Sequence, residues 1–110
     1  MKYDSSSSYQ GSLRYFGSAI TGDGRILLTG GSLISTGDAV NTAYEATVQK
    51  LTKFSRKKNM GSRRYAHACV CLNGYIYAMG GFDNKDADGI APSTLDFCER
   101  FNFHENKWSQ

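Results

Sequence analysis

The sequence predicts an all-β protein made of two four-stranded antiparallel units, and three observations support this fold class. The segment Arg14 to Gly31 and the segment Arg64 to Gly81 align without a gap at an offset of 50 residues. Each copy ends on a double glycine, and a repeat period near 50 residues is typical of architectures built from one supersecondary unit per repeat. No stretch between the turns keeps the i, i+3, i+4 spacing of an amphipathic helix.

The first two strands of each unit are predicted to form a hairpin. Two apolar runs flank a turn in each copy: 66–72 and 75–79 around Asn73-Gly74, and 18–21 and 26–29 around residues 22–24. An Asn-Gly pair between two such runs is a strong hairpin signal. The runs are apolar on both parities, which indicates strands covered on both faces of the sheet.

Two more strands are expected in each unit, at 42–47 and 48–54 in the first copy and at 94–103 and 107–110 in the second. Tyr44 stands seven residues before Leu51, and Phe101 stands seven residues before Trp108. Four antiparallel strands in about 50 residues describe one blade of a β-propeller. We therefore expect a polar lead over residues 1–13, a first blade over 14–60 and a second blade over 61–110.

These markers resemble the kelch repeat, whose pattern joins Met, Arg and His, a turn glycine, a double glycine and later aromatic positions. The second copy supplies Met60, Arg64, His67, Gly74, Ile76-Tyr77, Gly80-Gly81, Phe101-Asn102 and Trp108. The first copy keeps the frame but has Gly17 in the His position and Leu51 in the Trp position, so we interpret it as degenerate. The resemblance implies a kelch-type β-propeller with an incomplete ring, because propellers usually close with about four to eight blades.

The sequence ends two residues after Trp108, inside the last expected strand. We therefore expect a piece of a larger propeller, completed by further blades or by self-association. Repeat units of this kind bury their apolar faces only by stacking on neighbours.

Composition and charge exclude several classes. The chain has 110 residues, with 13 Lys or Arg against 10 Asp or Glu, and this small excess does not predict nucleic-acid binding. Three cysteines without a zinc-knuckle spacing predict reduced, buried thiols and no metal or other cofactor. No apolar run approaches the ~20 residues of a membrane span, and the start lacks a secretory signal. We expect a location in the cytoplasm or nucleus.

The kelch resemblance implies that the interblade loop and the loop between the second and third strands share one partner-binding face. These loops fall at 55–65, 32–41 and 82–93. The last is long, because 20 positions separate Gly81 from Phe101 but only 13 separate Gly31 from Tyr44. The stretch over 51–60 also exceeds the usual kelch spacing by about three residues. Loop extensions on a rigid scaffold favour a binding role, although ordinary solvated loops are the alternative.

Eight residues on or beside these loops are predicted to contact a partner: Arg14, Lys57, Lys58, Arg63, Arg64, Tyr65, Asp83 and Asp86. A guanidinium group is a planar fork that suits carboxylates, so we expect an acidic segment of a protein partner. The alternative for Arg14 and Arg64 is that each pairs with carbonyls or acids of a neighbouring blade.

Chemical motifs do not favour catalysis. A strand carrying His67, Cys69 and Cys71 and an acidic loop over 83–88 suggest metal sites, but neither has the required ligand spacing. Nucleophile, phosphate-loop and paired-carboxylate motifs are missing from the sequence. The sequence therefore predicts a non-enzymatic protein-interaction module. Two alternatives stay open: polyanion binding, to nucleic acid or acidic membrane, through the basic loop over 56–64, and a truncated product without separate activity.

Overall fold

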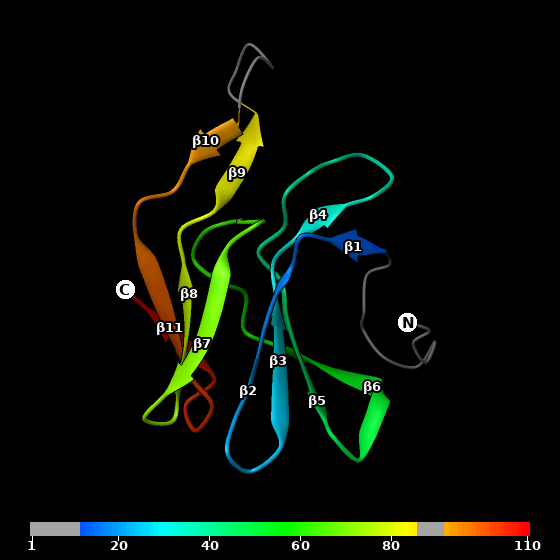
Figure 1. The fold of residues 1–110 in the computed structure, drawn as a ribbon, viewed down its shortest axis with the longest axis vertical. Coiled ribbons are helices and arrows are strands. Elements are labelled where there is room, and N and C mark those ends of the chain that lie inside the picture. The colour runs from blue at the N-terminus through cyan, green and yellow to red at the C-terminus, as the bar shows by residue number, and fades with distance from the viewer. Residues whose placement is uncertain (1–11, 86–91) are drawn as a thin grey trace.

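The computed structural model describes residues 12–85 and 92–110, and every regular element in these ranges is a β-strand. Two four-stranded antiparallel sheets stand side by side (Figure 1). Blade 1 contains, in spatial order, β2 (Gly17–Ile20), β3 (Arg25–Thr29), β5 (Ala43–Thr47) and β6 (Lys50–Lys57). Blade 2 contains β7 (Ala68–Leu72), β8 (Tyr75–Met79), β11 (Cys98–Asn102) and β12 (Lys107–Ser109). The predicted fold class is confirmed.

The inner hairpins form where the sequence predicts them. In blade 2, Leu72 pairs with Tyr75, so the turn holds only Asn73 and Gly74. Both residues have positive φ, 52° and 82°, as the turn that matches the twist of a two-residue hairpin requires.

Two small sheets lie outside the blades, and the sequence did not predict them. β1 (Leu13–Arg14) pairs with β4 (Ser32–Leu33), and β9 (Phe82–Lys85) pairs with β10 (Pro92–Thr94). The expected strand over 94–103 was too long, because Thr94 belongs to β10, residues 95–97 are in no strand, and β11 runs over Cys98–Asn102. The blade sheets themselves span residues 17–57 and 68–109, and the expected domain boundaries at 14, 61 and 110 stay predictions.

The outer hairpins of the two blades differ in register, which corrects one expectation. Phe101 pairs with Trp108, but Tyr44 pairs with Arg56 and not with Leu51. Phe101 lies opposite Ile76, whereas the residue opposite the equivalent Ile26 is Ala46. The equal spacing of seven residues was therefore misleading, because a four-residue turn precedes Lys107 while Thr47 and Lys50 close a two-residue turn.

A bulge in β6 contains the extra residues that were assigned to the interblade loop. From the pair Thr47–Lys50 to the pair Glu45–Ser55, β6 advances five residues while β5 advances two. The surplus of three residues sits inside the strand, so the expected extension of the interblade loop was wrong. Phe54 lies in this bulge and is buried against Tyr44 and Ala46.

The core between the blades is formed by one face of each sheet. Leu27 and Ala43 of blade 1 meet Ile76 and Phe101 of blade 2, and all four side chains have no exposed surface. The half-buried Trp108 packs against Phe101, with ring centroids 5.1 Å apart. Removing large apolar side chains from water is the main driving force for this contact.

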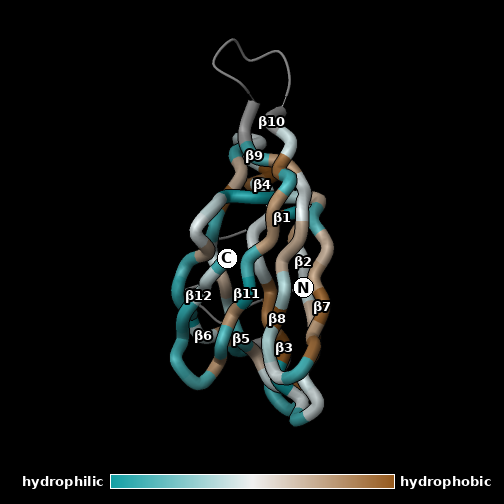
Figure 2. Tube along the Cα trace, turned by 90° about the vertical axis from the view of Figure 1, so that its left-hand side faces the viewer, coloured by the Kyte–Doolittle hydropathy of each residue, from teal (hydrophilic) through white to brown (hydrophobic). Residues whose placement is uncertain are grey.

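The opposite face of blade 2 stays open. Val70, Leu72 and Met79 project from β7 and β8 with 44%, 56% and 37% of their surface exposed. Figure 2 looks onto this side of the molecule and shows the apolar stretches along both strands. No helix among the described residues is long and apolar enough to span a membrane.

Candidate functional site

One end of the molecule brings the predicted loops together (Figure 1). The N–H of Arg64 donates to the carbonyl of Val40 at 3.2 Å, and the carbonyl of Arg64 accepts from the N–H of Gly31 at 2.8 Å. Tyr65 exchanges two hydrogen bonds of 2.9 Å with Phe82. The interblade segment therefore ties both long loops into one surface. We call this surface the loop face, made of residues 12–16, 30–42, 58–67 and 80–85.

Glycine is required where the interblade segment crosses the ends of β3 and β8. Gly30 and Gly81 both have positive φ, 58° and 87°. A Cβ at Gly30 would collide with the carbonyl oxygen of Arg64, and a Cβ at Gly81 would lie 2.6 Å from that of Tyr65. At Gly80 the nearest such atom is 3.8 Å away. Gly30 therefore allows the interblade segment to approach the end of β3, and Gly81 allows the same segment to approach the end of β8.

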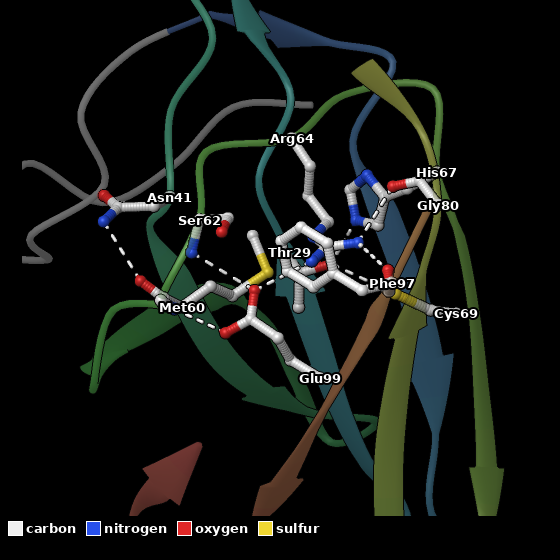
Figure 3. Close-up of polar contacts among 11 residues, drawn as sticks. Thr29, Asn41, Met60, Ser62, Arg64, His67, Cys69, Gly80, Phe97 and Glu99 are labelled. Atoms are coloured by element: carbon white, nitrogen blue, oxygen red, sulfur yellow. Dashed lines mark hydrogen bonds and ion pairs between the residues drawn. The ribbon is translucent and has the colours of Figure 1, made fainter. Parts of the chain in front are cut away.

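Arg64 is fully buried, and its guanidinium group is held inside the fold (Figure 3). One terminal nitrogen donates to the carbonyls of Gly80 at 2.9 Å and Phe97 at 3.1 Å. The other donates to the carboxylate of Glu99 at 2.9 Å. A buried charge is tolerated when it is paired and hydrogen-bonded in this way. Arg64 therefore pairs with carbonyls and an acid, as the alternative expected, but these groups belong to its own blade and not to a neighbouring one, and the side chain lies off the exposed surface.

Glu99 also shapes the interblade segment. Its carboxylate accepts hydrogen bonds from the backbone N–H groups of Gly61 and Ser62, the latter at 3.2 Å. The side chain is 3% exposed. Arg64 and Glu99 together fix the path of the segment that leads to Tyr65.

Arg14 occupies the same repeat position as Arg64 but lies exposed on the loop face. Its guanidinium carbon is 5.3 Å from the centroid of the Tyr15 ring, within the range of a cation–π contact. Within the described part of the chain Arg14 makes no ion pair.

Three of the predicted basic residues have acidic partners. Arg63 pairs with Asp83 at 3.2 Å, and Lys57 pairs with Glu45 at 3.3 Å. The third is Arg64, whose partner is described above. The Arg63 side chain is exposed, the pair of Lys57 with Glu45 is half-buried, and the pair of Arg64 with Glu99 is buried. Each pair reduces the positive field of the basic loop.

Lys58 is fixed through its backbone and not through its charge. Its N–H donates to Asn106 at 3.0 Å, and its carbonyl accepts from the indole N–H of Trp108 at 2.7 Å. Lys58 and Trp108 both line a pocket of about 400 Å³. Asp86, the remaining predicted residue, lies outside the described residues.

A pocket of about 580 Å³ opens on the loop face, lined by Arg14, Tyr15, Ser32, Thr36, Gly37, Asp38 and Tyr65. The two tyrosine rings stand 6.3 Å apart between centroids. Arg14 offers a cation and Asp38 an anion, so the pocket can hold a carboxylate and a hydrogen-bond donor at separate points. Among the predicted residues that the structure describes, Arg14 and Tyr65 line it.

The sequence prediction missed Tyr15 and the pocket residues of the loop over 32–38. The repeat could have identified Tyr15 as a candidate, because it stands 50 residues before the predicted Tyr65. The loop residues carry no comparable signal, because hydroxyl and acidic side chains are common in any exposed loop.

Below the loop face, one hydroxyl joins the two blades. Thr29 Oγ1 lies 2.7 Å from His67 Nε2 and 3.1 Å from Cys69 Sγ. Burial, with a smaller effect of the Arg64 charge, lowers the pKa of His67 to about 4, and burial raises the pKa of the Cys69 thiol. Both groups are therefore neutral near pH 7, a poor state for a thiolate nucleophile. In residues 12–85 and 92–110, no three His, Cys, Asp or Glu side chains gather as a metal ion would require.

Comparison with known proteins identifies the repeat. A family model described as the Kelch motif matches residues 63–110. Kelch-like protein 40 from Xenopus tropicalis is 30% identical over 95 residues, which cover 84% of this chain. The chain spans only 15% of the length of that relative.

Solved structures share the fold at low sequence identity. A fungal alcohol oxidase of the AA5 family, in complex with copper, matches 92% of this chain and 19% of its own, with a TM-score of 0.68 and 20% identity. YjhT matches 91% of this chain and 27% of its own, with a TM-score of 0.69 and 19% identity. At these identities the likeness concerns the fold alone.

Proposed function

This chain belongs to the kelch-repeat family, and from that premise we propose that it is a non-enzymatic protein-interaction module. The partner binds on the loop face, in and around the pocket between Tyr15 and Tyr65. The observation that carries the proposal is the pocket itself, to which the first repeat and the interblade segment contribute and which holds an exposed guanidinium group beside two aromatic rings. Binding sites on repeat scaffolds favour such loop-built surfaces.

The partner segment carries an acidic side chain that contacts Arg14. This arginine is exposed and lines the pocket, and a guanidinium group binds a carboxylate with two parallel hydrogen bonds. Arg63 assists electrostatically from the same face, although Asp83 offsets part of its charge. Arg64 contributes by holding the interblade segment in place.

The neutral state of His67 and Cys69 supports a module without catalysis, because these buried groups supply neither a thiolate nor a charged acid at neutral pH. The copper-bound alcohol oxidase shares only the fold with this chain. A location in the cytoplasm or nucleus stays a prediction.

Polyanion binding through residues 56–64 has less support. Such binding depends on several unpaired cations that release counterions from phosphates. Three of the cations in this loop are paired with Glu45, Asp83 and Glu99.

The test uses an array of immobilised 12-residue peptides of varied net charge, probed with the full chain. We expect the retained peptides to be enriched in Asp and Glu. The variant Arg14→Gln should bind them at least about tenfold more weakly, as expected for loss of one charge-assisted contact.

Arg100→Gln is the matched control, because Arg100 is also exposed and lies over a tyrosine ring, that of Tyr75, on blade 2 away from the loop face. Its binding should stay within about twofold of the unchanged protein. Equal losses in both variants, or no acidic enrichment, would refute the acidic-segment proposal. Tight binding of the chain to duplex DNA with a steep salt dependence would favour the polyanion alternative.

A further inference from the structure

The pocket between Tyr15 and Tyr65 contains two charges of opposite sign. Arg14 and Asp38 both line this pocket. They form no ion pair with each other, and neither pairs with another residue in the described part of the chain. The cation and the anion therefore stand at separate points of one binding site.

Strand pairing fixes the distance between the two charged residues along the backbone. Ser32 pairs with Arg14 of β1 on one side and bridges to Ala39 on its other side. Neighbouring strands are about 4.8 Å apart, so the backbones of Arg14 and Ala39 are separated by about 10 Å. Asp38 directly precedes Ala39 in the chain. The two charges are thus carried by the two segments that flank β4.

The backbone of Asp38 is held in a tight loop. The N–H of Leu33 donates to the carbonyl of Asp38 at 2.9 Å, and the N–H of Gly37 donates to the carbonyl of Leu33 at 2.7 Å. The N–H of Asp38 donates to the hydroxyl of Thr36 at 3.2 Å. None of these bonds uses the carboxylate. Asp38→Asn therefore removes the charge and keeps the groups that hold the loop.

The two charges disfavour a uniformly acidic ligand. A carboxylate that approaches Arg14 is attracted by the guanidinium group and repelled by Asp38. A ligand that also places a cation beside Asp38 replaces this repulsion with a second attraction. Like charges brought together in a binding site penalise the wrong partner, so the pocket favours a ligand that carries both signs.

We propose that the partner segment is dipolar: its acidic side chain meets Arg14, and a Lys or Arg of the same segment meets Asp38. This inference rests on the proposed function and adds the second charge of the partner. Residues two or four positions apart lie on one face of an extended segment, about 6.6 and 13 Å from each other. These distances bracket the backbone separation in the pocket, and the long side chain of Lys or Arg spans the difference.

The probe is a set of 12-residue peptides with an uncharged background. Two of them carry one Glu and one Lys, placed two or four positions apart, and in two matched peptides Gln replaces the Lys. We expect the better Glu–Lys peptide to bind at least about fivefold more tightly than its Glu–Gln counterpart. Fluorescence anisotropy of the labelled peptides with the full chain measures both affinities.

On the protein side, Asp38→Asn should weaken the Glu–Lys peptide at least about fivefold. The same variant should bind the Glu–Gln peptide more tightly, because a repulsion is removed. Opposite shifts for two peptides separate a lost charge contact from a lost fold.

Glu105→Gln is the matched control. Glu105 is also an exposed acid, but it lies in the turn between β11 and β12, at the end of blade 2 where Asn102 pairs with Tyr75. That end is remote from the loop face. The control should change the affinity for either peptide by less than about twofold.

The outcomes distinguish this inference from the proposed function. Glu–Gln peptides that bind through Arg14 as tightly as Glu–Lys peptides would overturn the dipolar segment and leave the acidic segment standing. Unchanged affinity of Asp38→Asn for the Glu–Lys peptide would also overturn it. If no peptide binds, or if Arg14→Gln binds all of them normally, both proposals fail.

Discussion

The two blades share one repeat, yet the same positions are buried in blade 1 and open in blade 2. Leu27 and Thr29 are 0% and 1% exposed because blade 2 covers them. Their counterparts 50 residues later are the half-buried Tyr77 and Met79, of which Met79 is 37% exposed. Strand pairing is therefore a property of each repeat, whereas burial is a property of its neighbour.

Arg14 and Arg64 occupy equivalent positions of the two repeats, and they also differ in burial. Arg64 is enclosed because β11 supplies Glu99 opposite Ala78. The blade 1 residue at that register position is Tyr44, opposite Leu28, so Arg14 has no equivalent acid to enclose it. The acidic residue thus accompanies the buried arginine and is missing beside the exposed one.

The histidine position differs for a steric reason. Gly17 stands in blade 1 where blade 2 has His67, and a side chain at Gly17 would crowd both His67 and Cys69. The degenerate first repeat therefore makes room for the side chains of its neighbour. Its departure from the kelch pattern is part of the packing between the blades.

The largest expected effect tests the difference in burial. Leu27→Ala should lower the free energy of unfolding by about 2–5 kcal/mol, because it leaves a cavity between the blades. Leu72→Ala removes the same atoms from a side chain that is 56% exposed, and it should cost less than about 1 kcal/mol. Urea titration of both variants measures the difference between their free energies of unfolding. Equal losses would mean that the two faces are equally covered in solution.

A smaller difference in the free energy of unfolding is expected between variants of Gly30 and Gly80, which occupy the same repeat position. Gly30→Ala and Gly80→Ala both introduce a side chain at positive φ, which costs about 1–2 kcal/mol. Gly30→Ala also forces a methyl group against the Arg64 carbonyl, for roughly a further 1–3 kcal/mol, while Gly80 has space for it. Thermal and urea unfolding measure the difference. Comparable losses at the two sites would contradict the close approach of blade 2 to Gly30.

The smallest effect concerns His67, which only blade 2 carries. Its pKa is about 4 in the fold and near 6.5 when unfolded, so the unfolded state binds the proton first as the pH falls. Its stabilising contribution is complete above about pH 6.5 and is lost between pH 6.5 and 4. Because the ring is partly exposed, we expect a loss of about 1–2 kcal/mol.

Unfolding curves at pH 7, 5.5 and 4 test this contribution. His67→Gln should flatten the pH dependence over this range. The same slope in both proteins would show that His67 is solvated.

Much of the fold was predictable because it depends on local chemistry. Asn73-Gly74 identified a hairpin turn through its preference for positive φ, and the double glycines identified the crossing points of the backbone. The register of the outer strands was not predictable from spacing, because the turn before Lys107 is two residues longer than the turn before Lys50, and β6 also contains a bulge before Ser55.

The sequence by itself determined the repeat, the all-β class and the end of the molecule where the long loops gather. Only the tertiary structure decided which of two equivalent arginines is buried, that Tyr15 joins Tyr65 and Phe82 in one row, and where a pocket opens. The physical reason is that turns and strand pairing depend on residues close in the chain. Burial and charge pairing depend on the blade that lies alongside, which the order of residues within one repeat does not specify.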